Sequence, residues 1–149
     1  MTVDELAVLF EGRTRFVERL ARELAVAGGG ADPFAVARRL LPAVPEDERL
    51  EALNAHPAIG ASPERLSPTS AREQGQDATP EVLADLARLN RAYEEKFGFR
   101  FVVFVNRRPK AEVLDVLKAR IGRPRSDELA TALAELVSIA QDRFLRRGP

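Results

Sequence analysis

The sequence predicts an all-α fold, a single compact domain of about seven or eight helices with one extended apolar segment near residues 99–105. Along most of the chain, apolar residues recur at steps of three and four, which is the spacing of one face of an α-helix. Glycines and prolines separate these stretches at short intervals. Because 149 residues fit one hydrophobic core and no linker interrupts them, we assign the whole chain, 1–149, to one domain.

The N-terminal third predicts a run of short helices. Residues 1–27 should be helical in one or two pieces, which the glycines at 28–30 end. Asp32 followed by proline is typical of an N-cap and a first helical residue, and starts a helix that the next prolines interrupt. A short helix from residue 46 to about 55 should follow.

The middle of the chain predicts a loop and then the clearest helix. Three prolines and a glycine give residues 56–68 the composition of a loop, and a short polar helix is possible at 69–75. Thr79 and Pro80 then supply a cap and a first-turn proline. Apolar residues at helical spacing continue to Phe97, where Gly98 should end the helix.

Residues 99–105 differ from the rest of the chain because they are rich in β-branched and aromatic residues. A lone strand has no partner for its backbone hydrogen bonds. The segment should therefore pair across a dimer, serve as core, or offer its amides to a ligand. Two helices should follow, one opened by Pro109 and closed by Gly122, and one capped by Ser126.

Composition excludes several classes of function. Lys plus Arg equals Asp plus Glu at 23 each, so the chain lacks the basic footprint expected for nucleic acid. It has no cysteine, which excludes disulfides and thiolate chemistry, and one histidine, which excludes a His-rich metal site. No apolar run reaches the length of a membrane span, so we predict a cytoplasmic protein.

The single histidine, His56, precedes a proline, which favours an extended backbone and places the imidazole just after a helix. A helix C-terminus should favour the charged imidazolium, and imidazole is the usual proton carrier near neutral pH. The alternative is a surface or capping histidine. A second cluster, Ser70, Glu73 and Gln74, would share one face of a short helix and could bind a polar ring, or could form only a capping box.

Taken in order, these weak motifs resemble one family. His56-Pro57-x-Ile59-Gly60, then Ser70-x-x-Glu73-Gln74-Gly75, then Asn90-x-x-Tyr93-x-x-Lys96-Phe97-Gly98-Phe99 are similar to the 2-oxo-4-hydroxy-4-carboxy-5-ureidoimidazoline (OHCU) decarboxylases of urate degradation. The resemblance extends to the Phe10-Glu11 region, the Asp32-Pro33-Phe34 segment, Arg120 and the last helix.

The resemblance implies an all-helical enzyme, usually a homodimer, without metal or organic cofactor, that makes (S)-allantoin from OHCU. It makes His56 the proton-transfer residue, with Glu73 beside it. It places substrate contacts on Pro57, Ser70, Ala71, Arg72, Glu73 and Gln74, on Phe101, Val102, Val103, Phe104 and Val105, and on Arg143. A functional link to urate oxidase and hydroxyisourate hydrolase also follows.

Three functions stay open at this point. The first is the decarboxylase, and the second is a related enzyme for another ureido or imidazoline acid. The third is a helical interaction module, which has no need of His56, Glu73 and Gln74 together. For Arg143 the alternative to substrate binding is a surface ion pair with a nearby acid.

Overall fold

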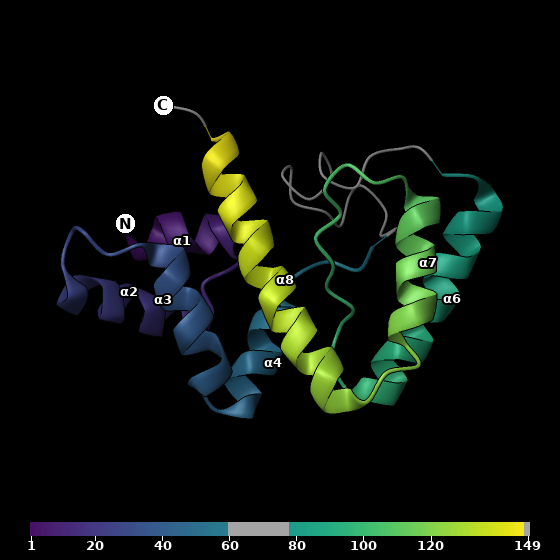
Figure 1. Cartoon of the computed structure of the whole chain (residues 1–149), viewed down its shortest axis with the longest axis horizontal. Coiled ribbons are helices and arrows are strands. Elements are labelled where there is room, and N and C mark those ends of the chain that lie inside the picture. The colour runs from purple at the N-terminus through teal and green to yellow at the C-terminus, as the bar shows by residue number, and fades with distance from the viewer. Residues whose placement is uncertain (60–77, 148–149) are drawn as a thin grey trace.

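The computed structural model describes residues 1–59 and 78–147, and within these ranges the regular structure is entirely helical (Figure 1). The helices are α1 (Val3–Leu9), α2 (Arg15–Ala27), α3 (Pro33–Leu40), the 3-10 turn η1 (Leu41–Ala43), α4 (Glu46–Asn54), α6 (Pro80–Phe97), α7 (Lys110–Arg120) and α8 (Arg125–Arg146). The predicted all-α class is confirmed. The expected polar helix at 69–75 lies outside the described residues.

Local capping explains the starts of four helices and the end of α6. The side-chain oxygens of Thr2, Thr14, Asp32 and Thr79 accept amide hydrogen bonds at the starts of α1, α2, α3 and α6. Gly98 adopts the left-handed conformation, with φ of 80°, and ends α6 as expected. These signals are short-range, so they could be predicted from neighbouring residues alone.

The expected cap at Ser126 is wrong. The last helix begins at Arg125, two residues earlier than a cap at Ser126 would allow, and Pro124 occupies the N-cap position without a side-chain hydrogen bond. The proline ring holds φ at −60°, which already suits the start of a helix. The first turn is instead favoured by Asp127 and Glu128, whose negative charges complement the positive end of the helix dipole.

The long helix α8 crosses the centre of the molecule (Figure 1). It packs against α1, α3 and α4 on one side, while α6 and α7 pair with each other on the other side. The extended segment 99–105 runs between α8 and α7. This arrangement leaves the extended segment and the C-terminal half of α8 facing each other.

An aromatic cluster fixes the start of the extended segment. Tyr93 lies at the centre, with ring-centroid distances of 4.6 Å to Phe97, 5.8 Å to Phe99 and 5.2 Å to Phe101. All four side chains are buried. Packing of this kind holds the segment in place, with no strand of residues 1–59 or 78–147 paired to it.

None of the helices in the described residues is both long and apolar enough to cross a membrane.

Candidate active site

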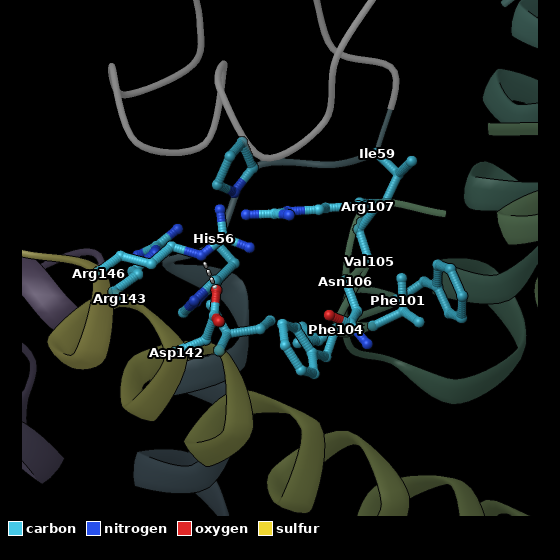
Figure 2. Close-up of a pocket in the computed structure, with 14 residues that line it drawn as sticks. His56, Ile59, Phe101, Phe104, Val105, Asn106, Arg107, Asp142, Arg143 and Arg146 are labelled. Carbon is cyan, nitrogen blue, oxygen red and sulfur yellow. Dashed lines mark ion pairs between the residues drawn. The ribbon is translucent and has the colours of Figure 1, made fainter. Parts of the chain in front are cut away.

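A pocket opens between the extended segment, the end of α4 and the C-terminal half of α8 (Figure 2). Its empty volume is about 620 Å³, part of which is continuous with solvent. The lining residues come from three places in the sequence: His56, Pro57 and Ile59; Phe101 to Arg107; and Ile139, Asp142, Arg143 and Arg146.

His56 lies two residues beyond the end of α4 and is buried, with 5% of its surface exposed. The surface-histidine alternative is therefore wrong. Neither ring nitrogen has a hydrogen-bond partner in the described part of the chain. A buried polar group without a partner is costly, so an imidazole that lines a pocket in this state is suited to meeting a ligand.

The end of α4, expected to favour the charged imidazolium, is not the dominant influence on His56. Burial, followed by the positive charge of Arg143, lowers the pKa of His56 from 6.5 to about 4. The carboxylate of Glu11 and the nearby backbone carbonyl of Ala52 act in the opposite direction but do not offset it. Desolvation exceeds the effect of the helix end, and the imidazole is neutral near pH 7.

Arg143, in the last turn of α8, is buried beside His56 and lines the pocket. Its Nη1 donates to the Leu9 carbonyl at 3.1 Å, and its Nη2 donates to Glu11 Oε1 at 3.0 Å. The predicted ion pair with a nearby acid exists, but it is buried rather than on the surface. The guanidinium of Arg143 thus forms an ion pair and also lines the pocket.

The mouth of the pocket carries more positive than negative charge. Arg107 and Arg146 enter from opposite walls, and Asp142 pairs with Arg146 at 2.9 Å (Figure 2). Among the described residues, three guanidinium groups, those of Arg107, Arg143 and Arg146, thus stand against the carboxylates of Asp142, in the lining, and Glu11, behind it. In a chain of zero net charge, this local excess favours an anionic ligand.

The extended segment offers backbone donors rather than a ladder. Arg120 donates to the Val102 carbonyl at 2.8 Å, and Arg108 donates to the carbonyls of Phe104 and Val105. The amides of residues 101–105, by contrast, donate to no acceptor in the described ranges. What the segment has left for a ligand is therefore a row of amide donors.

Two further side chains hold the loop that carries His56. Arg100 donates to the His56 carbonyl at 2.6 Å, and the Asn90 amide donates to the Ile59 carbonyl at 2.9 Å. Asn90 is buried within α6, so it anchors this loop to the opposite side of the fold. The position of the imidazole therefore depends on residues that do not themselves line the pocket.

The structure brings together many of the predicted site residues. His56, Pro57, the run from Phe101 to Val105 and Arg143 all line one pocket. The predicted contacts at Ser70, Ala71, Arg72, Glu73 and Gln74 lie outside the described residues.

Several lining residues were not predicted, among them Asn106, Arg107, Asp142 and Arg146. A signal existed for the two on α8, because residues at steps of three and four from Arg143 and Ile139 share its face. Both Asn106 and Arg107 are left-handed, with φ of 50° and 63°, in the turn that follows the extended segment. Asparagine tolerates this region and is a weak signal for it, whereas no local signal marks Arg107.

No group of three or more His, Cys, Asp or Glu side chains within residues 1–59 and 78–147 is arranged to hold a metal ion.

The chain resembles known proteins over nearly its whole length. The family model described as OHCU decarboxylase matches residues 2–145. The 2-oxo-4-hydroxy-4-carboxy-5-ureidoimidazoline decarboxylase of Haloferax volcanii is 33% identical over 108 residues, which cover 68% of this chain and 62% of that protein. The uric acid degradation bifunctional protein of Bacillus sp. (strain TB-90) is 31% identical, over 66% of this chain and 20% of its own length. The chain thus spans less than two thirds of the curated relatives it matches.

Solved structures agree with the fold. An OHCU decarboxylase crystallised in the presence of (S)-allantoin matches with a TM-score of 0.76 and 28% identity, covering 97% of this chain and 96% of that one. An (S)-allantoin synthase matches with a TM-score of 0.69 and 24% identity, over 96% of this chain and 48% of that one. At this identity, the match supports the fold alone. With a family model matching residues 2–145, the chain belongs to the OHCU decarboxylase family.

Proposed function

We propose that this chain, acting as one domain over residues 1–149, decarboxylates OHCU to (S)-allantoin in urate degradation. The observation that carries the proposal is the convergence, in one pocket, of a buried neutral imidazole, a buried guanidinium and a row of amides that donate to no acceptor among the described residues. An anionic substrate with a carboxylate and ring carbonyls requires this combination of groups. The family membership supports the same reaction.

The reaction needs little beyond positioning and proton transfer. In OHCU one ring carbon carries both a carboxylate and a hydroxyl. When the bond to the carboxylate breaks, carbon dioxide leaves and the electron pair moves into the adjacent unsaturated ring. The pair passes through the adjacent C=N bond to the ring nitrogen, which takes a proton from solvent and leaves an enol. The enol hydroxyl then loses its proton and becomes a carbonyl, while the neighbouring ring carbon gains a proton. The substrate is its own electron sink, so the protein must hold it and deliver a proton to one face.

His56 is suited to the proton transfers because a neutral imidazole has one donor and one acceptor nitrogen. It can accept the proton of the substrate hydroxyl and return a proton to the ring. A bound carboxylate would also raise the pKa of His56 from about 4 towards neutrality, since a nearby negative charge favours the protonated form. Substrate binding itself would thus bring the imidazole into the range in which proton transfer is efficient.

Arg143 and the extended segment would hold the charges of the substrate. The Arg143 guanidinium balances the carboxylate, and the amides between Phe101 and Val105 donate to ring carbonyls, where negative charge develops as the bond breaks. Because these donors are fixed by packing, they need no reorganisation during the reaction. Predicted contacts at Ser70 and Gln74, with Glu73 near His56, would complete the site.

A coupled assay tests the proposal. Urate oxidase and hydroxyisourate hydrolase generate the unstable substrate in a cuvette, this protein is added, and circular dichroism follows the allantoin formed. We expect rapid appearance of one enantiomer. Slow racemic product at the rate seen without the protein would reject OHCU as the substrate and favour a related ureido or imidazoline acid.

A homodimer, a cytoplasmic location and a working link to the two preceding enzymes remain predictions. Size-exclusion chromatography with light scattering tests the dimer, and a single species of monomer mass at micromolar concentration would contradict it.

A further inference from the structure

The guanidinium of Arg143 is held from the end of α1, a region that contributes no residue to the pocket lining. Both of its hydrogen bonds in the described chain go there, to the Leu9 carbonyl and to Glu11. The side chains of Arg143 and Glu11 are only 4% and 12% exposed. The ion pair is therefore shielded from solvent, where a charge-assisted hydrogen bond is strong and directional.

The residue that follows the C-cap of α1 has a left-handed backbone, and it is not the glycine usually found there. The Gly12 amide donates to the Ala7 carbonyl at 2.8 Å, which is the wide hydrogen bond of a Schellman motif. In that motif the residue before Gly12 is left-handed and is usually glycine. Here it is Glu11, with φ of 63°. A side chain at this position carries a backbone cost that glycine avoids, so it needs a compensating role.

The same helix end also supplies the second acceptor. Carbonyls in the last turn of a helix lack intrahelical partners, and the Leu9 carbonyl is satisfied by Arg143. The neighbouring Phe10 is 2% exposed, and its ring packs edge-on against that of Phe16, with 5.5 Å between the ring centroids. This helix end is therefore anchored in the core. Both groups that hold Arg143 thus sit on a rigid support.

Backbone strain in the described chain is concentrated around the pocket. The non-glycine residues with positive φ are Glu11, Asn106 and Arg107. Asn106 and Arg107 line the pocket, and Glu11 holds a side chain that does. Strained residues persist where the surrounding structure imposes them and are common at functional sites.

From this geometry we propose that Glu11 is a positioning residue for the decarboxylation, which fixes Arg143 in the pocket through its carboxylate oxygen and through the length of its side chain. The inference rests on the proposed function, because it assigns Arg143 the binding of the substrate carboxylate. Glu11 contacts Arg143 and does not line the pocket, and its charge acts on His56 only against the larger effects of burial and Arg143. Loss of Glu11 should therefore weaken substrate binding without removing His56 from its place.

Three substitutions of Glu11 distinguish the contributions of its oxygen acceptor, its side-chain length and its charge. Glu11→Gln keeps the length and an oxygen acceptor but removes the charge. Glu11→Asp keeps the charge, is one methylene shorter and tolerates the left-handed backbone well, so it should fold. Glu11→Ala removes both acceptor and charge. Asp85→Ala, which breaks the exposed ion pair with Arg88 on α6, is the matched control.

We expect kcat/KM in the coupled assay to fall about 10- to 100-fold in Glu11→Ala and Glu11→Asp, mainly through KM, because a displaced binding group costs this much. Glu11→Gln should keep most of the activity, and Asp85→Ala all of it. In an Arg143→Ala background, Glu11→Ala should cause no further loss, since the residue it serves is absent. Additive losses, or a Glu11→Asp variant as active as the wild type, would overturn the proposal.

A readout without turnover keeps this test separate from the proposed function. The guanidinium protons of Arg143, assigned in nitrogen-15 NMR spectra by their loss in Arg143→Lys, should be protected from exchange in the wild type and in Glu11→Gln. They should exchange rapidly in Glu11→Ala. Unchanged protection in Glu11→Ala would refute the positioning role, whether or not the wild type makes allantoin. Absence of allantoin with normal protection would reject the proposed function alone.

Discussion

Two buried arginine–glutamate pairs lie at the two ends of α8, and only one of them reaches the pocket. Near the C-terminal end, Arg143 pairs with Glu11 and lines the pocket. In the first turn, Glu128 is fully buried and pairs with Arg120, whose Nη1 holds the Val102 carbonyl. Each charge on α8 has the sign that its end of the helix dipole favours.

The two pairs differ in what surrounds them. Glu128 also accepts hydrogen bonds from the Tyr93 hydroxyl and from Arg123, so its oxygens are fully used within the protein. Burial and the Glu128 carboxylate raise the pKa of Tyr93 and keep its hydroxyl protonated as a donor. The pair at Glu128 thus fixes the wall of the pocket from behind, whereas the pair at Arg143 presents a charge to a ligand. Burial alone therefore does not mark an ion pair as part of the candidate site; a place in the pocket lining does.

Breaking the pair between Arg120 and Glu128, called the rear pair below, should have the largest effect on the free energy of unfolding. Glu128→Ala leaves Arg120 buried without its counter-charge, and we expect a loss of about 3–5 kcal/mol in the free energy of unfolding. Chemical denaturation measures it, with Asp85→Ala as the exposed control, for which about 0.5 kcal/mol or less is expected. A loss in Glu128→Ala no larger than in the control would remove the proposed difference between buried and exposed pairs.

The pocket side should show its own pH dependence. Because folding lowers the pKa of His56 from 6.5 to about 4, the unfolded chain binds a proton between these pH values that the folded chain does not. Stability should therefore fall as the pH drops through this window, by about 3 kcal/mol in total from this group. Burial is the largest cause of the lowered pKa of His56; the charges of Arg143 and Arg100 lower it further, and the carboxylate of Glu11 opposes them.

His56→Gln should remove this component and leave the remaining pH dependence, which comes from the carboxylates. Denaturation midpoints at a series of pH values, compared between wild type and variant, isolate the histidine. Parallel curves for the two proteins between pH 6.5 and 4 would show that the buried His56 is charged in the folded state.

The hydrogen bond from Arg120 to Val102 links the rear pair to the pocket. Arg120→Lys keeps the charge but loses the planar fork, leaving the Val102 carbonyl without its donor, at a cost of about 1–3 kcal/mol. Amide hydrogen exchange should then speed up across residues 101–105, and added (S)-allantoin should protect them less than in the wild type. If (S)-allantoin protected these amides equally from exchange in Arg120→Lys and in the wild type, the pair between Arg120 and Glu128 would have no influence on ligand binding.

The smallest expected effect lies at the mouth of the pocket. Arg107 is left-handed, so Arg107→Gly should raise the free energy of unfolding by up to about 1 kcal/mol. It should also lower kcat/KM, because a positive charge that attracts the anionic substrate is lost. Arg107→Gln keeps the strain and loses only the charge. If Arg107→Gly changed activity while Arg107→Gln did not, the charge would have no role.

What could be predicted from the sequence was local. Helices capped by Asp32 and Thr79 or ended by Gly98 follow from neighbouring residues, as does the position of His56 just after a helix. The charge state of His56 could not be predicted, because it depends on burial and on Arg143, which is distant in the sequence. The cap at Ser126 failed for a local reason, since Pro124 starts the helix without one.

Some residues of the candidate site could likewise be predicted from the sequence, and others could not. Family resemblance indicated Pro57, Arg143 and the extended segment, and the structure brings them to one pocket. It included the Phe10-Glu11 region without assigning it a role, because the ion pair with Arg143 forms only when α1 packs against α8. The left-handed backbone of Arg107 could not be predicted either, since arginine does not favour this region; Asn106 before it was the one weak signal.

Stereospecific proton delivery by His56 is the central claim, and the most direct measurement is circular dichroism of the allantoin formed by wild type and His56→Ala in the coupled assay. We expect rapid formation of the (S) enantiomer by the wild type. In His56→Ala the rate should fall by about 10²- to 10⁴-fold, the usual contribution of a proton-transfer residue, with racemic product from the uncatalysed reaction. A folded His56→Ala that still made (S)-allantoin at the wild-type rate would contradict the account.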